Sequence, residues 1–181
     1  MQTRIASSPG RFLWRMKVDY LNPFLNSIVQ IVQSQLSENP QRGRITLRTE
    51  YPFRAGEVAI IVGITGAVQG QVALSMSRSA ALAAAARMMM EDALDELDEY
   101  AQSALSEMAN MITANATIAL ADAGFSCDIT PPSLIVGSDI QISPRESIKT
   151  IVIPLELTVG AIEVNLSLEE APAGAQAMSP N

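Results

Sequence analysis

Hydrophobic residues in this chain recur at two different spacings, and the change from one to the other marks out its elements. Between Leu21 and Leu36 they return every three to four positions, the period of an amphipathic helix. Asn22 is a typical N-cap and Pro23 a typical first helical residue. The pattern therefore predicts a helix over 21–36.

Two later stretches also favour helices. Residues 77–90 are rich in Ala and Met, and residues 93–122 form a second, longer candidate that Gly124 is placed to end. Elsewhere the hydrophobic positions alternate, which is typical of strands. The alternation predicts a short strand at 45–48, a hairpin of 57–64 with 68–76, and a second hairpin of 149–159 with 161–168.

The order helix, short strand, hairpin thus occurs twice, over 21–76 and over 93–168. We interpret this as a structural duplication with an α+β fold, in which a mainly antiparallel sheet is packed with long helices. Residues 1–16 are expected to be a disordered extension, 17–170 one domain, and 171–181 a disordered tail. Glu156, Glu163 and Asn165 are expected on the outward face of the last hairpin, whose unpaired edge suits a contact between two chains.

Composition removes several classes of chemistry. The 181 residues include no histidine and a single cysteine, so Ser-His-Asp and Cys-His nucleophile pairs and His-based zinc sites are excluded. One cysteine also excludes an intramolecular disulfide, which suits a reducing compartment, and we expect a cytoplasmic protein. A net charge of −7 argues against nucleic acid as the partner. No apolar run is long enough for a spanning helix, so no membrane partner is expected.

Acidic residues are concentrated between Glu91 and Glu107, where seven lie with no basic residue among them. Most are expected in the first turns of the second long helix, where the helix dipole favours anions. Capping and solubility are one interpretation of this segment. The other is an acidic rim that attracts a basic surface on a partner.

The most specific chemistry lies on that same helix. Ser103, Glu107 and Asn110 follow one another at spacings of four and three, which places all three on one stripe. The apolar residues of the helix cluster on roughly the opposite side. The helix can therefore bury its apolar face and still present a carboxylate and an amide to solvent, a combination suited to hydrolysing a phosphoryl group held by a partner. Asn115 falls on the apolar side, and we expect it buried and hydrogen-bonded.

The residues around this stripe carry a family resemblance. The segment 97–116, the segment Asp128-Ile129-Thr130-Pro131-Pro132-Ser133-Leu134-Ile135 and the segments 58–66 and 70–72 are the distinctive ones. At these positions the chain resembles the CheX branch of the CheC/CheX/FliY phosphatases of bacterial chemotaxis, over roughly 17–168. The family motif is a Ser or Asp, three residues, a Glu, two residues and an Asn, then a proline some twenty residues on. Ser103, Glu107 and Asn110 match it, and either Pro131 or Pro132 lies near the proline position.

The resemblance implies a phosphatase for the aspartyl-phosphate of a CheY-like response regulator, and a homodimer. Asn110 would orient the attacking water, Glu107 would pair with a lysine of the regulator, and Ser103 would lie at the contact edge. The enzyme would need no cofactor or metal of its own, because the regulator supplies Mg²⁺.

Three other readings stay open at this point. One is a module that docks on a response regulator or on the flagellar switch without hydrolysis. Another is a dimerisation domain with a solvated helix face. The last is a small-molecule enzyme with its own pocket, for which the sequence offers no histidine and no phosphate loop.

Overall fold

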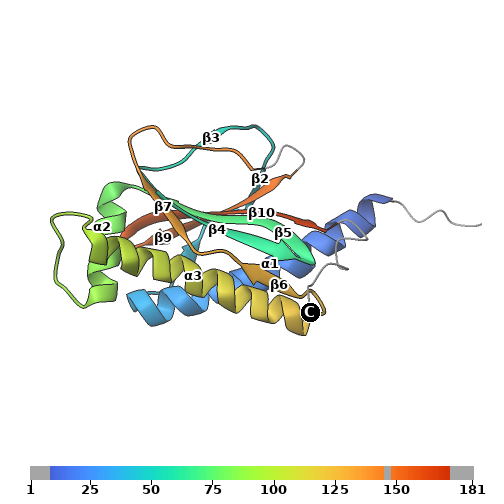
Figure 1. Cartoon of the computed structure of the whole chain (residues 1–181), viewed down its shortest axis with the longest axis horizontal. Helices are drawn as coiled ribbons and strands as arrows, with labels where there is room; N and C mark the ends of the chain where they lie inside the picture. Colours follow the sequence, from blue (N-terminus) through green and yellow to red (C-terminus); the bar gives the residue numbers. More distant parts are fainter. Residues whose placement is uncertain (1–8, 145–147, 172–181) are drawn as a thin grey trace, which may run out of the picture.

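Three helices and ten strands make up the part of the chain that the computed structural model describes, residues 9–144 and 148–171, with the backbone alone for 9–19. Two helices cover one face of a sheet, and a small two-stranded sheet lies over the other face (Figure 1). In chain order the elements are α1 (Pro9–Leu36), β1 (Gln41–Arg42), β2 (Thr46–Arg48), β3 (Phe53–Arg54), β4 (Val58–Gly66), β5 (Val68–Met76), α2 (Arg78–Met89), α3 (Glu99–Asp122), β6 (Cys127–Ile129), β7 (Ser133–Val136), β8 (Gln141–Ile142), β9 (Thr150–Leu157) and β10 (Gly160–Glu170).

The predicted duplication is confirmed, and the two halves exchange strands. The sheet order is β1-β9-β10-β5-β4-β6, with β2 also pairing β9 and β7 also pairing β4, all antiparallel. The short strands β1 and β2 of the first half thus pair with β9 in the hairpin of the second half. The short strands β6 and β7 of the second half pair with β4 in the hairpin of the first half. The small sheet pairs β3 of one half with β8 of the other. Neither half can complete its sheet alone, so the two fold as a single unit.

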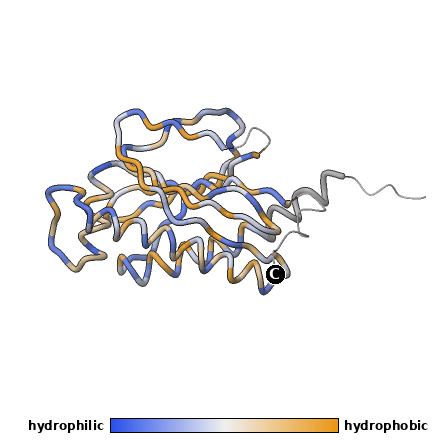
Figure 2. The backbone as a smooth tube through the Cα atoms, viewed as in Figure 1, coloured by the Kyte–Doolittle hydropathy of each residue, from blue (hydrophilic) through white to orange (hydrophobic). Residues whose placement is uncertain are grey.

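The main core lies between the sheet and the two long helices. Figure 2 shows hydrophobic positions concentrated on the central strands of the sheet. The buried side chains of α3 recur at helical spacing, so one face of this helix packs on β4 and on α1. Truncating a fully buried leucine in such a core typically costs about 2–5 kcal/mol. The buried hydrophobic residues of α3 are Ala101, Leu105, Met108, Ala109, Ile112, Ala116 and Leu120.

The second face of the sheet is covered as well, which the sequence did not indicate. A smaller cluster there contains Phe53, Ile140 and Ile142. Asn165, expected to point outward, is only 1% exposed, because it accepts a 2.7 Å hydrogen bond from Arg48 Nη1 and lies under the segment that carries this arginine. Asn165 thus lies with Glu163 on the face opposite the aliphatic residues of β10, as expected, but this face is covered here and not open to solvent.

The last hairpin has no free edge of the kind the sequence suggested. The strands β9 and β10 form a hairpin that turns before Gly160, as predicted. However, β10 lies between β9 and β5, and the other side of β9 is paired with β1 and β2. The edges of the sheet are instead formed by the short strands at its two ends.

Both long helices begin elsewhere than predicted. The first starts at Pro9, so Asn22 is not its N-cap, Pro23 lies inside it, and a disordered extension through residue 16 is wrong for residues 9–16. Buried Tyr20 and Phe24 pack into the core on either side of Pro23, and this packing offsets the hydrogen bond that the proline lacks. The predictions for residues 1–8 and 172–181 lie outside the described residues.

The second long helix starts at Glu99 rather than at residue 93. The side chain of Asp98 accepts a 2.8 Å hydrogen bond from the Ala101 N–H and so caps the helix. Only Glu99 is an acidic residue of the first turn, and most of the acidic segment lies in the loop before the helix. At the other end Gly124 follows the helix with φ +95° and donates to the Ala121 carbonyl, as expected of a terminating glycine.

Candidate active site

The stripe of Ser103, Glu107 and Asn110 lies on the solvent side of α3. Ser103 and Glu107 are exposed and Asn110 is half-buried, while Leu105 and Met108, which alternate with them, are fully buried. A rigid helix, capped at one end by Asp98 and ended at the other by Gly124, therefore fixes the direction in which the carboxylate and the amide project.

The two catalytic candidates of this stripe have no partner within the described part of the chain. The carboxylate of Glu107 and the carboxamide of Asn110 make no side-chain hydrogen bond or ion pair there. In contrast, the buried amide of Asn165 is bonded to both Arg48 and Glu163. Side chains that stabilise a fold usually find partners in it, so free polar groups on a rigid element are available to an external molecule.

A shallow, open groove borders the stripe. Its second wall is the connection between β6 and β7, which contributes both candidate prolines of the motif. This wall is fixed to β4, because Thr130 and Gly63 exchange two 2.9 Å hydrogen bonds. The residues that line the groove are Glu99, Gln102, Ser103, Ser106, Glu107, Asn110, Pro131, Pro132 and Leu134.

Three residues of the groove were missed from the sequence. Glu99, Gln102 and Ser106 lie on the same side of α3 as Ser103 and Asn110, and their helical spacing from these residues was the available signal. Asn115 was expected to be buried and hydrogen-bonded, which is wrong. It is half-buried and has no side-chain hydrogen bond to a described residue, and the buried polar groups of this helix are Thr113 and Thr117.

The corresponding part of α1 cannot form a second stripe. Both helices end five residues before the next strand, so their ends can be aligned. In this alignment Leu21 takes the place of Glu107 and Phe24 the place of Asn110. Phe24 is fully buried and Leu21 packs against the core, so the first half offers neither a carboxylate nor an amide there.

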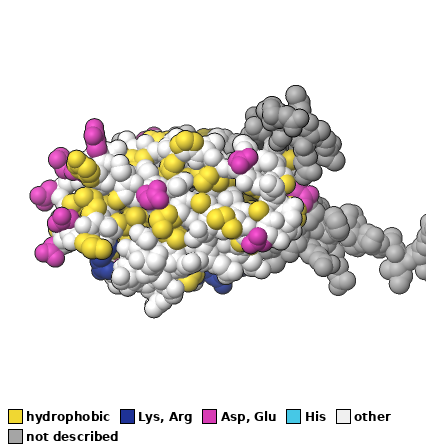
Figure 3. Space-filling model, turned by 60° about the horizontal axis from the view of Figure 1, so that its bottom comes forward, with side chains coloured by type: hydrophobic (Ala, Val, Ile, Leu, Met, Phe, Trp, Pro, Cys, Tyr) yellow, Lys and Arg dark blue, Asp and Glu magenta, His cyan; other side chains and the backbone are white. Residues whose placement is uncertain are grey.

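Acidic side chains gather at one end of the helix-covered face (Figure 3). This end carries the loop between α2 and α3, where Glu91, Asp92, Asp95 and Glu96 are all exposed, and it adjoins the groove at Glu99. A cationic molecule that approaches the groove from this end meets a favourable field.

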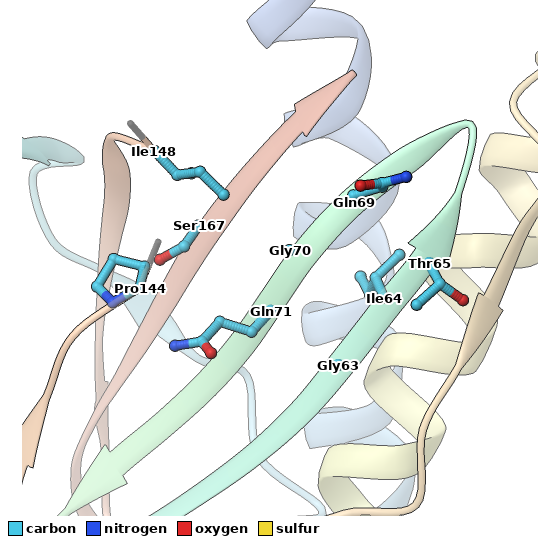
Figure 4. Close-up of a pocket in the computed structure, with 9 residues that line it drawn as sticks. All are labelled: Gly63, Ile64, Thr65, Gln69, Gly70, Gln71, Pro144, Ile148 and Ser167. Atoms are coloured by element: carbon cyan, nitrogen blue, oxygen red, sulfur yellow. The ribbon is translucent and has the colours of Figure 1, made fainter. Parts of the chain in front are cut away.

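A separate cavity of about 170 Å³ lies on the opposite face of the sheet (Figure 4). Gln71 and Ser167 point toward Pro144 across it, and none of its lining residues is charged. The hydroxyl of Ser167 is already 2.7 Å from that of Thr150. This cavity has no acid or base for a reaction on a small molecule. In the described residues there is also no cluster of metal-ligating side chains, and no helix is long and apolar enough to cross a membrane.

Known proteins share both the sequence and the fold. The family model described as chemotaxis phosphatase CheX matches residues 58–156. The CheY-P phosphatase CheX of Thermotoga maritima is 30% identical over 127 residues, which is 70% of this chain and 81% of that protein. Among solved structures, a CheX from Desulfovibrio desulfuricans has a TM-score of 0.76 at 25% identity, over 83% of this chain and 99% of the other. The CheX–CheY–BeF3–Mg²⁺ complex from Borrelia burgdorferi has a TM-score of 0.72 at 30% identity, over 83% of this chain and 98% of the other.

The duplicated fold is thus that of the CheC/CheX-like proteins. Within that class, the chain belongs to the CheX family of chemotaxis phosphatases. The resemblance inferred from residues 97–116 and their neighbours is confirmed, and so is the prediction of a protein phosphatase.

Proposed function

We propose that this protein removes the phosphoryl group from the aspartyl-phosphate of a CheY-like response regulator. The observation that carries the proposal is the pair Glu107 and Asn110, presented without partners in the described chain beside an open groove on a rigid helix. The named activity of the Thermotoga maritima relative and the CheY present in the Borrelia burgdorferi complex support the choice of substrate.

The chemistry requires mainly positioning. In phosphoryl transfer, catalysis comes almost entirely from alignment and from stabilisation of charge. Asn110 would enter the phosphorylation site and hold a water in line with the scissile bond. The water oxygen then bonds to phosphorus while the bond to the aspartyl oxygen breaks, which yields a carboxylate and inorganic phosphate. Glu107 would pair with the lysine of the regulator, and Ser103 would lie at the edge of the contact.

No metal or cofactor of the enzyme itself takes part in this scheme. The regulator brings the Mg²⁺ that neutralises the phosphoryl oxygens, and the carboxylate of Glu107 is used for docking rather than for binding a metal. We place the reaction in the cytoplasm, where the regulator is phosphorylated.

The test of the water-positioning role is Asn110→Ala. Loss of an orienting group costs on the order of 10²-fold in turnover, and an alanine on a helix surface leaves the fold intact. Asn26→Ala is the matched control, because Asn26 is an exposed asparagine on the other long helix. Phosphate release from the phosphorylated regulator should fall in the first variant alone. Near-normal turnover in Asn110→Ala would refute the mechanism.

Glu107 is tested by affinity. Glu107→Gln should weaken binding to a beryllofluoride-activated receiver roughly tenfold, since an ion pair across the interface is lost. Asp122→Asn removes one exposed carboxylate from the far end of the same helix and serves as the charge control. Equal affinities for both variants would leave Glu107 without a docking role. If wild type binds the activated receiver but releases phosphate from the phosphorylated receiver no faster than the receiver does alone, the alternative of a binding module without catalysis holds.

We also propose a homodimer, through the sheet edge farthest from the groove. The strand β2 pairs with β9 on one side only in the described chain, and its Leu47 is 44% exposed. A contact at this edge would leave both grooves free, since β6 and β7 form the other end of the sheet. Light scattering should give about twice the chain mass of 19.4 kDa for wild type, and Leu47→Asp should lower it to one chain. A monomeric wild type would refute the dimer and leave the catalytic proposal intact.

A further inference from the structure

Tyr100 is an exception among the aromatic side chains of this protein. Aromatic residues are only 4% of the sequence. Where the structure describes their side chains, Tyr20, Phe24 and Phe53 are buried, and the remaining two besides Tyr100 are half-buried. Tyr100 is 75% exposed and has no hydrogen bond or ring contact with a described residue. A large amphipathic ring left in water by the fold is typical of a binding surface.

The position of this ring connects it to the proposed catalytic stripe. Tyr100 precedes Glu107 by seven residues, two helical turns, so the two side chains project within about 20° of each other around α3. Along the axis, Tyr100 lies about 15 Å from Asn110 at 1.5 Å per residue. A standard protein interface of about 800 Å² per partner has a diameter of about 32 Å. One such footprint therefore covers both residues.

The groove indicates in which direction a partner extends from Asn110. All its α3 residues lie between Glu99 and Asn110, and none follows Asn110. A molecule seated over Glu107 and Asn110 thus occupies the half of α3 that carries Tyr100. The exposed Ile118 lies on the other half of the helix, beyond the end of the groove.

We propose that Tyr100 is an aromatic anchor for the receiver of the phosphorylated response regulator, and that its ring packs on an apolar patch of the receiver bordered by basic side chains. Asp98 and Glu99 directly precede Tyr100 in the chain, and the exposed acidic loop comes before them, which gives the charge complementary to such a border. Tyrosine suits this role because it supplies a large contact area and has only two side-chain torsions to order. Tyr100 contributes affinity and takes no part in the bond changes. This inference rests on the proposed function.

The experiment separates docking from chemistry. KM and kcat for the phosphorylated receiver, and the Kd for the beryllofluoride-activated receiver, are measured for wild type, Tyr100→Ala, Tyr100→Phe and Ile118→Ala. Tyr100→Ala should raise KM and Kd about tenfold with kcat within twofold of wild type, since truncating an interface aromatic acts on binding. Tyr100→Phe, which keeps the ring, should restore most of the affinity, and Ile118→Ala should match wild type.

Two results overturn the inference. One is a Kd of Tyr100→Ala within twofold of wild type. The other is an equal loss in Tyr100→Ala and Ile118→Ala, which would show that the footprint does not favour the groove side. If one of these two results is obtained and Asn110→Ala still abolishes turnover, the role of Tyr100 is refuted and the proposed function stands. An active Asn110→Ala would refute the proposed mechanism, and the Kd values would still decide the role of Tyr100.

Discussion

Replacing Glu38 with glutamine should destabilise the protein in a way that depends on pH. The carboxylate of Glu38 joins the end of α1 to the turn between β9 and β10. It accepts a 2.6 Å hydrogen bond from the Thr158 N–H and a 2.5 Å bond from the Thr158 hydroxyl, and it lies 3.6 Å from the Arg87 guanidinium at the end of α2. Its side chain is only 9% exposed. One carboxylate thus connects three elements that are far apart in the sequence.

These contacts determine the sign of the pH effect. Burial disfavours the charged form, but the hydrogen bonds from Thr158 and the charge of Arg87 outweigh it and hold the pKa of Glu38 below its ordinary value. A lowered pKa in the folded state means that the unfolded chain takes up the proton first. The contribution of Glu38 is therefore complete above about pH 5 and is lost as the pH falls through the folded pKa.

The magnitude follows from the number of bonds lost. A hydrogen bond to a charged acceptor contributes about 1.5–3 kcal/mol, and glutamine can still accept one of the two bonds from Thr158. Glu38→Gln should therefore lower the free energy of unfolding by about 2 kcal/mol at pH 7, or the Tm by roughly 4–8 °C.

Urea unfolding at pH 7 and at about pH 3 measures the difference in unfolding free energy between wild type and Glu38→Gln. Glu50→Gln is the control, because Glu50 is exposed and has no ion pair in the described chain. The difference in unfolding free energy from wild type should narrow at the lower pH for Glu38→Gln and be absent at both pH values for Glu50→Gln. If Glu38→Gln is destabilised by the same amount at both pH values, the assignment of the stabilisation to the charged form of Glu38 is refuted.

Three further predictions test the fold and the stoichiometry. Gly70→Ala should lower the free energy of unfolding in urea by more than about 3 kcal/mol, because a Cβ would lie 1.9 Å from the Ser167 carbonyl oxygen. Gly124→Ala, whose Cβ meets nothing within 4 Å, should lower it by about 1 kcal/mol. Equal losses in the two variants would contradict the geometry. Arg48→Ala should cost about 2–3 kcal/mol, because it removes the donor to the buried amide oxygen of Asn165, and a change in Tm below about 2 °C would exclude that bond as a stabilising one. Calorimetric titration with activated receiver should saturate at one receiver per chain, because α1 holds the apolar Leu21 and Phe24 at the positions equivalent to Glu107 and Asn110. Two receivers per chain would contradict this.

Boundaries of elements were where the sequence misled most. Asn22 and Pro23 are typical of the start of a helix, yet the chain is helical from Pro9. The helix continues through Pro23 because Tyr20 and Phe24, on either side of it, are buried in the core. The acidic residues before Asp98 look like helical first-turn residues, yet the cap formed by Asp98 starts the helix after them. Local composition could not decide these cases, since packing on distant residues outweighs the local preference.

The sequence by itself determined the two hairpins, the long helices and the stripe of Ser103, Glu107 and Asn110. All of these depend on spacings of two to four residues, which a single segment contains in full. Only the tertiary structure decided which strands pair across the two halves, that Asn165 is covered by Arg48, and that the loop at Pro131 and Pro132 forms the second wall of the groove. These relations join residues separated by twenty to more than a hundred positions, and such pairs are fixed by the packing of the whole domain, because no local period encodes them.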